Sequence, residues 1–316
     1  MFKVLTSTEN LSHDEWLEYR RMGIGGSDSS VVCGINKYKS PIELWLDKTS
    51  QETQDEAGES AYWGTTLEPI VRAEFTKRTG IEVFLVNQIL QSTEYPFMLA
   101  NLDGVCSHPD YGTVVFEAKT ANAFKAGDWE DDEIPDDYVL QVQHYLSVTG
   151  YRGAYIAVLI GGNTFKWKFI ERDDDLIAML IQLESEFWRR VQSNTSPLLD
   201  GSEASANFLK RYFPNSTPQT KIELPAEALG LIEQYEKYSR EADAFTEKKQ
   251  QTENLLKQML GENEAGVIND RIITWKTVNQ ERLDTKTLKA EHPKLYQKYA
   301  NSSSYRRFSV KQVIEK

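Results

Sequence analysis

Residues 97–119 read FMLANLDGVCSHPDYGTVVFEAK, in which two apolar runs lead to charged side chains. The runs predict neighbouring strands that bring Asp103 close to Glu117 and Lys119. Because side chains alternate along a strand, Glu117 and Lys119 project to one face, while Ala118 points into the core and offers its backbone carbonyl. Burying charged side chains beside such strands costs free energy, so their presence there indicates a function.

Two carboxylates, a carbonyl oxygen and an ammonium form the kind of site that suits Mg²⁺, which prefers oxygen ligands. Such a set is typical of metal-assisted cleavage of a phosphodiester bond. An acidic residue followed at a loose spacing by Glu-x-Lys also occurs as solvated surface charge, but here the apolar flanks favour a buried site. The residues therefore predict a metal-dependent nuclease.

The composition limits which classes of protein this chain can belong to. The chain has 316 residues, 40% hydrophobic and 11% aromatic, which is enough for one large domain and a smaller one. It has no long apolar run and no basic segment leading into one, so we expect a cytoplasmic protein without membrane association. Its two cysteines, Cys33 and Cys106, exclude a disulfide framework and a four-cysteine metal site.

The net charge of −12 argues mildly against nucleic-acid binding, which draws on Lys and Arg. The charge is uneven, however. Residues 266–316 hold 11 Lys+Arg and 5 Asp+Glu, a net +6, which leaves −18 for residues 1–265. Basic patches beside an acidic metal site remain compatible with DNA.

The order of predicted elements indicates an α/β fold with a mixed sheet flanked by helices. Ser27 is expected to cap a short helix after a glycine-rich turn, an arrangement that suits an anion, although a plain N-cap is the simpler reading. A loop is expected at 51–60, and a connector at 194–225 around a short helical piece near Phe208 and Leu209. Helices are expected after a Ser12/Glu15 capping box, from Pro41, after Trp63-Gly64 to Gly80, and over 136–149, 174–193 and 226–260. Strands are expected at 81–90, 97–106, 113–119, 153–160, 164–171, around Asn269-Asp270 and at 305–311.

Several separated motifs, taken in order, resemble the YqaJ-like viral recombinase family, relatives of lambda exonuclease within the PD-(D/E)XK nucleases. The likeness covers about residues 12–215, with a looser echo in the basic tail. Leu102 stands where the superfamily name has proline, a departure that leaves the metal chemistry intact. The motifs are Arg20 through Ile24-Gly25-Gly26-Ser27-Asp28, Ser40-Pro41 to Leu46, Gly64 to Leu67-Glu68-Pro69, Leu102-Asp103-Gly104, Glu117-Ala118-Lys119, and Gln141 to Tyr145.

The resemblance implies a restriction-endonuclease-like nuclease core at 1–215 and an extension at 216–316, made of a long amphipathic helix and a basic β/α tail. It implies an exonuclease that degrades one strand of linear duplex DNA from the 5′ end. The remaining 3′ single strand would serve a single-strand annealing partner in phage-type homologous recombination. It also implies a homo-oligomer, a trimeric ring in relatives.

The resemblance also assigns roles to residues. Asp103, Glu117, the Ala118 carbonyl and Glu68 would hold Mg²⁺ or Mn²⁺, and Lys119 would orient the nucleophile or stabilise the developing charge. Gln141 would hydrogen-bond near the metal with Tyr145 in support, since the two share a helix face. Arg20 and Ser27, with Tyr145 beside them, match a pocket for the terminal 5′ phosphate.

Other readings stay open. An endonuclease on the same fold would share the metal residues, and a catalytically silent binding or assembly module would not need them. Arg306, Arg307 and Lys311 are candidates for contact with DNA or a partner, or form a solvated basic edge. His144 is expected to be a partly buried helical histidine rather than a ligand, and the 226–260 helix a packing or assembly surface.

Overall fold

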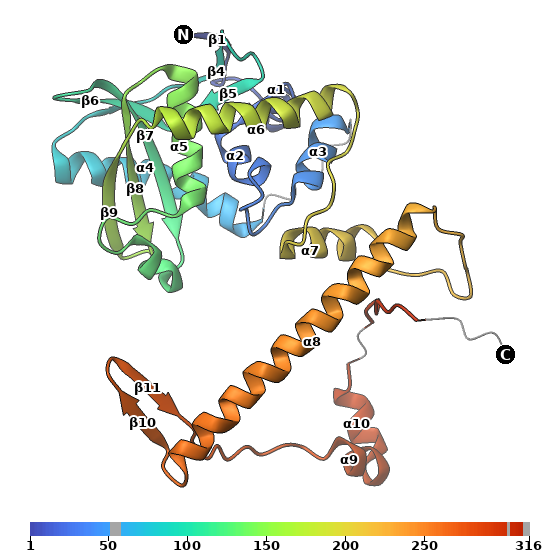
Figure 1. Cartoon of the computed structure of the whole chain (residues 1–316). Coiled ribbons are helices and arrows are strands. Elements are labelled where there is room, and N and C mark those ends of the chain that lie inside the picture. Colours follow the sequence, from blue (N-terminus) through green and yellow to red (C-terminus); the bar gives the residue numbers. More distant parts are fainter. Residues whose placement is uncertain (51–57, 302–303, 312–316) are drawn as a thin grey trace. The chain divides into compact units, whose positions relative to one another are not determined.

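A computed structural model describes residues 1–50, 58–301 and 304–311, and divides the chain into two compact units, Met1–Tyr212 and Phe213–Lys316. The first unit contains two sheets and most of the helices (Figure 1). Its strands are β1 (Phe2–Ser7), β2 (Ile24–Gly25), β3 (Val83–Phe84), β4 (Gln88–Ser92), β5 (Met98–Asn101), β6 (Gly104–His108), β7 (Gly112–Ala121), β8 (Gly153–Ile160) and β9 (Thr164–Glu171). Its helices are α1 (His13–Arg21), α2 (Gly26–Val32), α3 (Pro41–Thr49), α4 (Glu59–Thr79), the 3-10 helix η1 (Ala123–Trp129), α5 (Asp136–Thr149), α6 (Asp174–Gln192) and α7 (Glu203–Tyr212).

The larger sheet has the order β3-β6-β7-β8-β9, with β7 and β8 parallel and the other neighbours antiparallel. Alternate residues of β7 pack into different cores. Val115 joins a cluster with Val142 and Leu146 of α5, whereas Val114 and Phe116 join one with residues of α4. The sheet is therefore covered by α5 on one face and α4 on the other, which confirms the predicted mixed α/β fold flanked by helices.

The smaller sheet has the order β1-β4-β5-β2, and two of its strands were not predicted. The β1 strand begins at residue 2 and pairs antiparallel with β4, while β2 is only two residues long and pairs parallel with β5. Neither strand has a clear alternation of apolar residues within its own short sequence. Both depend on backbone pairing with a partner strand, which local patterns do not reveal.

Two predicted strands are each two strands in different sheets. The one predicted at 81–90 consists of β3 in the larger sheet and β4 in the smaller. The one predicted over residues 97–106 is divided in the same way. β5 ends at Asn101 in the smaller sheet, and β6 begins at Gly104 in the larger one. A Cβ on Gly104 would lie 2.6 Å from Val83 Cγ1 and 2.9 Å from the Phe84 carbonyl oxygen, so β3 leaves room only for glycine at this crossing. Leu102 and Asp103 therefore stand where the chain passes from one sheet to the other.

Three other local predictions need correction. α4 begins at Glu59, inside the segment predicted as a loop, and the rest of that prediction at 51–57 lies outside the described residues. Ser27 does not cap α2: the N-cap is Gly25, whose N–H donates to Asp28 Oδ2 at 3.0 Å. Residues 305–311 form no strand, because no described strand pairs with them.

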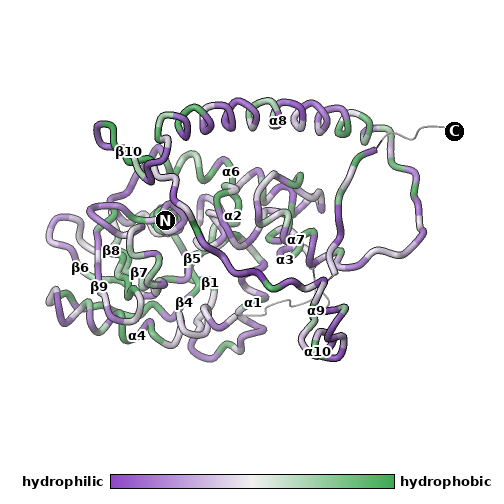
Figure 2. The backbone as a smooth tube through the Cα atoms, turned by 90° about the horizontal axis from the view of Figure 1, so that it is seen from below, coloured by the Kyte–Doolittle hydropathy of each residue, from purple (hydrophilic) through white to green (hydrophobic). Residues whose placement is uncertain are grey.

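The second unit consists of α8 (Glu227–Leu260), the hairpin β10 (Ala265–Ile268) and β11 (Arg271–Thr274), α9 (Thr285–Glu291) and α10 (Pro293–Tyr299). Hydrophilic residues predominate along α8, with hydrophobic ones at intervals (Figure 2). Near its end Leu260 is buried and Lys257 lies 5.5 Å from the ring centroid of Trp275, just beyond β11. Among the described residues, no helix is both long and apolar enough to cross a membrane.

Candidate active site

Asp103 reaches β7 from the crossing between the two sheets. Its Oδ2 accepts a hydrogen bond from the Ala118 N–H at 2.8 Å. The neighbouring pair Gly104–Phe116 is in register, so the carboxylate lies beside the segment that carries Glu117. Burial raises the pKa of Asp103, although Lys119 opposes this shift. The prediction that Asp103 and Glu117 approach one another therefore agrees with the geometry.

Glu117 and Lys119 share the α5 face of β7, as the strand alternation predicts. Glu117 Oε1 accepts hydrogen bonds from Lys119 Nζ at 2.7 Å and from Gln141 Nε2 at 2.6 Å. Lys119 Nζ also donates to Gln141 Oε1 at 3.0 Å, and Gln141 Nε2 donates to Tyr145 Oη at 3.1 Å. The Lys119 ammonium lies 5.0 Å from the ring centroid of Tyr138. One network thus joins β7 to α5.

The second oxygen of Glu117 is the most informative atom of the site. Glu117 is 2% exposed, and its Oε2 is buried with no hydrogen-bond partner among the described residues. Burial raises the pKa of Glu117 to about 8, and the nearby Asp103 carboxylate adds to the shift. A buried carboxylate oxygen without a donor is costly unless a cation or a proton meets it.

The residues present fit a Mg²⁺ ion. Mg²⁺ is usually held by one or two carboxylates and keeps several waters, so Asp103 and Glu117 with the Ala118 carbonyl suffice. Within the described ranges, no group of three or more His, Cys, Asp or Glu side chains is placed to hold a metal ion, so Glu68 does not form one cluster with Asp103 and Glu117. Glu68, the remaining predicted ligand, accepts a hydrogen bond from Arg72 at 3.1 Å. Burial raises the pKa of Glu68, and the charge of Asp103 adds to the shift.

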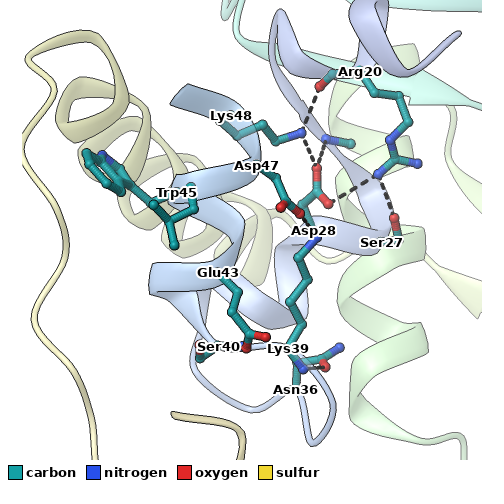
Figure 3. A network of polar contacts seen from close by, with 12 residues as sticks. Arg20, Ser27, Asp28, Asn36, Lys39, Ser40, Glu43, Trp45, Asp47 and Lys48 are labelled. Atoms are coloured by element: carbon teal, nitrogen blue, oxygen red, sulfur yellow. Dashed lines mark hydrogen bonds and ion pairs between the residues drawn. The ribbon is translucent and has the colours of Figure 1, made fainter. Parts of the chain in front are cut away.

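Arg20 and Ser27 meet at a second polar site, drawn in Figure 3. Arg20 Nη2 donates to Ser27 Oγ at 2.9 Å and to Asp28 Oδ1 at 3.2 Å. They line a pocket of about 810 Å³ whose wall also holds Trp16 and Tyr38. The two residues assigned to phosphate recognition are therefore in direct contact, on α1 and α2.

Tyr145 stands between the two polar sites. Its hydroxyl belongs to the Gln141 network, and its ring packs so closely on Gly26 that a Cβ there would lie 2.5 Å from Cε1. Burial raises the pKa of Tyr145 well above its usual value. Tyr145 is buried, so the structure supports contact with both sites through neighbours rather than an exposed DNA-binding side chain.

The other candidates lie in the second unit. Arg306 Nη1 donates to the Phe213 carbonyl at 3.3 Å, and Arg307 and Lys311 are exposed. Arg306 is thus bonded within that unit, while Arg307 and Lys311 are accessible to a partner. Contact of these residues with DNA or a partner remains a prediction.

Sequence reasoning missed several buried polar residues. Lys48 Nζ donates to Asp28 Oδ2 at 2.8 Å and to the Arg20 carbonyl at 2.7 Å. His144, predicted to be partly buried, is fully buried and bonded to Glu184 of α6. The available signal for Lys48 was a charged residue close behind the apolar run Leu44 to Leu46 of the same predicted helix. Nothing local marks Glu184 in the sequence.

Comparison with known proteins places the chain in a family. Residues 15–152 match the model of the YqaJ-like viral recombinase domain. The chain is 43% identical over 315 residues to the uncharacterized protein YqaJ of Bacillus subtilis, with 98% of each chain covered. It is 30% identical over 145 residues to the uncharacterized protein R354 of Acanthamoeba polyphaga mimivirus, covering 43% of this chain and 26% of that one.

Among solved structures, the chain is similar to the alkaline exonuclease LHK-Exo of Laribacter hongkongensis. The TM-score is 0.49 at 22% identity, over 64% of this chain and 98% of that one. The near full-length match to YqaJ decides the family, because it spans both units at 43% identity. The chain belongs to the YqaJ-like viral recombinase family.

Proposed function

We propose that this protein is a Mg²⁺-dependent exonuclease that degrades one strand of linear duplex DNA from its 5′ end. The observation that carries the proposal is the buried, unpartnered Oε2 of Glu117, held beside Asp103 and Lys119 on the face of β7. Membership of a viral recombinase family supports a role in recombination. The product would be a 3′ single-stranded tail for an annealing protein.

Asp103, Glu117 and the Ala118 carbonyl would hold the ion. Glu68, which accepts a hydrogen bond from Arg72 in this structure, would join them when the metal binds. Bound there, the metal would supply Lewis-acid polarisation of the phosphate and a more acidic water. Lys119 stands beside Glu117 and would orient the attacking water or balance the charge that develops on the phosphate oxygens. Burial opposes the charge of Lys119, but the carboxylates of Glu117 and Asp103 raise its pKa.

Gln141 fixes this arrangement from α5. Its amide nitrogen binds Glu117 and its carbonyl accepts from Lys119, so one side chain sets the spacing of an acid and a base. The same amide nitrogen reaches Tyr145, which packs on Gly26 next to Ser27. In the proposal, this contact links the cleavage site to the pocket for the 5′ phosphate. Assembly into a ring-shaped homo-oligomer is part of the proposal through the family resemblance.

Digestion of end-labelled linear duplex DNA, with and without Mg²⁺, tests the function. We expect Mg²⁺-dependent release of nucleotides from the 5′-labelled strand before the 3′ label is lost, and no cleavage of covalently closed circular duplex. Equal rates on closed circles and linear DNA would instead indicate an endonuclease on the same fold. Absence of cleavage with either Mg²⁺ or Mn²⁺ would favour a silent binding module.

A further inference from the structure

We propose that Lys48 and Asp28 are positioning residues that keep the charge of Arg20 available to the phosphate at a DNA 5′ end. The inference rests on the proposed phosphate pocket and assigns to two further residues of its lining a role that acts through Arg20. Lys48 and Asp28 are both almost fully enclosed, with side-chain exposures of 4% and 8%, whereas Arg20 is 27% exposed. The buried pair thus contacts a cation that is only partly exposed.

The Asp28 carboxylate is saturated by donors from three elements. Oδ1 accepts from Arg20 Nη2, and Oδ2 accepts from the Gly25 N–H and from Lys48 Nζ (Figure 3). Burial alone would raise the pKa of Asp28, but Lys48 and Arg20 together hold it far below its usual value. Asp28 is therefore a permanent anion that two cations share.

Charge balance assigns a role to Lys48. If Arg20 were the only counter-ion of a buried carboxylate, the two groups would neutralise one another and attract no further anion. With Lys48 present, the three side chains sum to one positive charge, and that charge is exposed only at Arg20. Burial lowers the pKa of Lys48, although Asp28 opposes the shift.

Geometry assigns a role to Asp28. It binds Arg20 through Nη2 alone, and Ser27 Oγ accepts from the same nitrogen. Among the described residues, no partner is recorded for the N–H groups on Nη1 and Nε, so part of the guanidinium remains available for oxygen atoms of a phosphate. Trp16 lies against the same group, with 5.0 Å from Cζ to its ring centroid.

Lys48 also fixes the backbone beneath Arg20. Its ammonium donates to the Arg20 carbonyl at 2.7 Å, in the last turn of α1. One buried lysine of α3 thus holds the main chain of Arg20 and the carboxylate that binds its side chain. Misplacing a recognition group by about 1 Å is enough to cost a large factor in recognition.

The test is the affinity for two duplexes that differ only in a 5′-phosphate or 5′-hydroxyl end, measured by fluorescence anisotropy without divalent metal. Binding is used because it does not depend on nuclease turnover. We expect the wild-type protein to prefer the phosphorylated end and Arg20→Ala to lose that preference. Lys48→Gln keeps an N–H donor but removes the charge, and should reduce the preference about tenfold, the scale of one charge-assisted hydrogen bond.

The double variant Asp28→Asn/Lys48→Gln separates this role from a merely structural one. It removes the buried anion and its buried counter-ion together, which leaves the Arg20 charge unneutralised, so the preference should recover relative to Lys48→Gln. A matched control is Lys77→Gln, which removes a surface charge paired with Glu74 at 3.6 Å on α4. Thermal melting of each variant checks that folding is kept.

Three results would overturn the inference: equal wild-type affinity for the two ends, an unchanged preference in Lys48→Gln, or no recovery in the double variant. If Lys48→Gln does not fold, the double variant still decides, since it must then bind the phosphorylated end preferentially. Phosphate preference without any DNA cleavage would leave the inference standing and remove the proposed nuclease activity. Cleavage without phosphate preference would do the reverse.

Discussion

At the scale of single residues, two buried carboxylates, those of Glu117 and Asp28, differ in how many of their oxygens have hydrogen-bond partners. Glu117 has one oxygen saturated by Lys119 and Gln141 and the other without a partner among the described residues. Asp28 has both oxygens saturated. The first carboxylate is thus suited to bind a cation, whereas the second serves to position cations that the protein already carries.

Asp103→Asn tests the metal-binding role of the carboxylate. Asparagine keeps an oxygen that can accept from the Ala118 N–H, so the fold should be retained, while the lost negative charge weakens the metal site. We expect Mg²⁺-dependent digestion of linear duplex to fall on the order of a thousandfold. Glu74→Gln, the same chemical change on the surface of α4, is the control and should digest normally. Normal digestion by Asp103→Asn would remove this residue from the site.

How far the site was predictable also depends on single residues. Glu117, Ala118 and Lys119 follow from strand alternation, because the apolar positions of β7 fix which side chains share a face. The shared face of Gln141 and Tyr145 follows from their spacing of four on a helix, but their place at the site was predicted from the family resemblance. Lys48 and Glu184 do not, since they meet their partners Asp28 and His144 only after distant elements pack.

At the scale of elements, the strands with strong apolar patterns were predictable and those that depend on pairing were not. β8 and β9 occupy the residues that their patterns predict, because each carries its own hydrophobic face. The break between β5 and β6 was missed because apolar residues stand on both sides of Asp103-Gly104, so residues 97–106 were read as one strand. The two strands are separated by a tertiary contact, the close approach of β3 to Gly104.

The contact of α2 with α5 gives a prediction for Gly26→Ala. A Cβ at Gly26 would lie 2.5 Å from Tyr145 Cε1 and 3.0 Å from the Gln141 carbonyl oxygen, so α5 must shift and carry Gln141 with it. We expect digestion to fall at least about tenfold, by displacement of catalytic groups. Gly230→Ala in α8, whose Cβ would have no neighbour within 4 Å, should leave digestion unchanged. Equal activity of the two variants would contradict the coupling.

The contact of α5 with α6 gives a prediction about pH. His144 Nε2 lies 2.9 Å from the Leu99 carbonyl oxygen and Nδ1 lies 2.9 Å from Glu184 Oε1, which also accepts from Ser29 Oγ. Burial alone would lower the pKa of His144, but Glu184 and these hydrogen bonds raise it above 6.5, with a smaller contribution from Asp28. The stabilisation from protonated His144 is therefore fully present below about pH 6.5 and is lost as pH rises through the raised value.

Urea unfolding between about pH 5 and about pH 9 measures this effect, which amounts to about 1.4 kcal/mol for each unit of pKa difference. In Glu184→Gln the carboxylate is gone and burial prevails, so the pKa of His144 falls and stability should instead decline toward low pH. The same pH profile in both proteins would show that the pair does not govern stability. Breaking a buried ion pair also costs about 3–5 kcal/mol, so Glu184→Gln should be less stable overall.

At the scale of the whole molecule, charge is distributed unevenly in a way that bears on DNA. The net charge is −12, yet residues 266–316 carry a net +6. The proposed cleavage residues all lie in the first unit, Met1–Tyr212, and the basic segment lies in the second, Phe213–Lys316. The chemistry of cleavage and the electrostatic attraction of DNA can thus reside in different units of one chain.

Arg307→Ala/Lys311→Ala tests whether the basic segment contacts DNA. Each phosphate contact contributes about 0.9 to the slope of log affinity against log salt, so loss of two contacts should reduce that slope by about two. Lys237→Ala/Lys248→Ala removes the same charge from exposed positions on α8 and should leave the slope unchanged. If the Arg307/Lys311 variant keeps the wild-type slope but fails to bind a protein partner, the segment serves assembly. If it keeps both, these residues form a solvated basic edge, and the attraction to DNA must arise from the first unit.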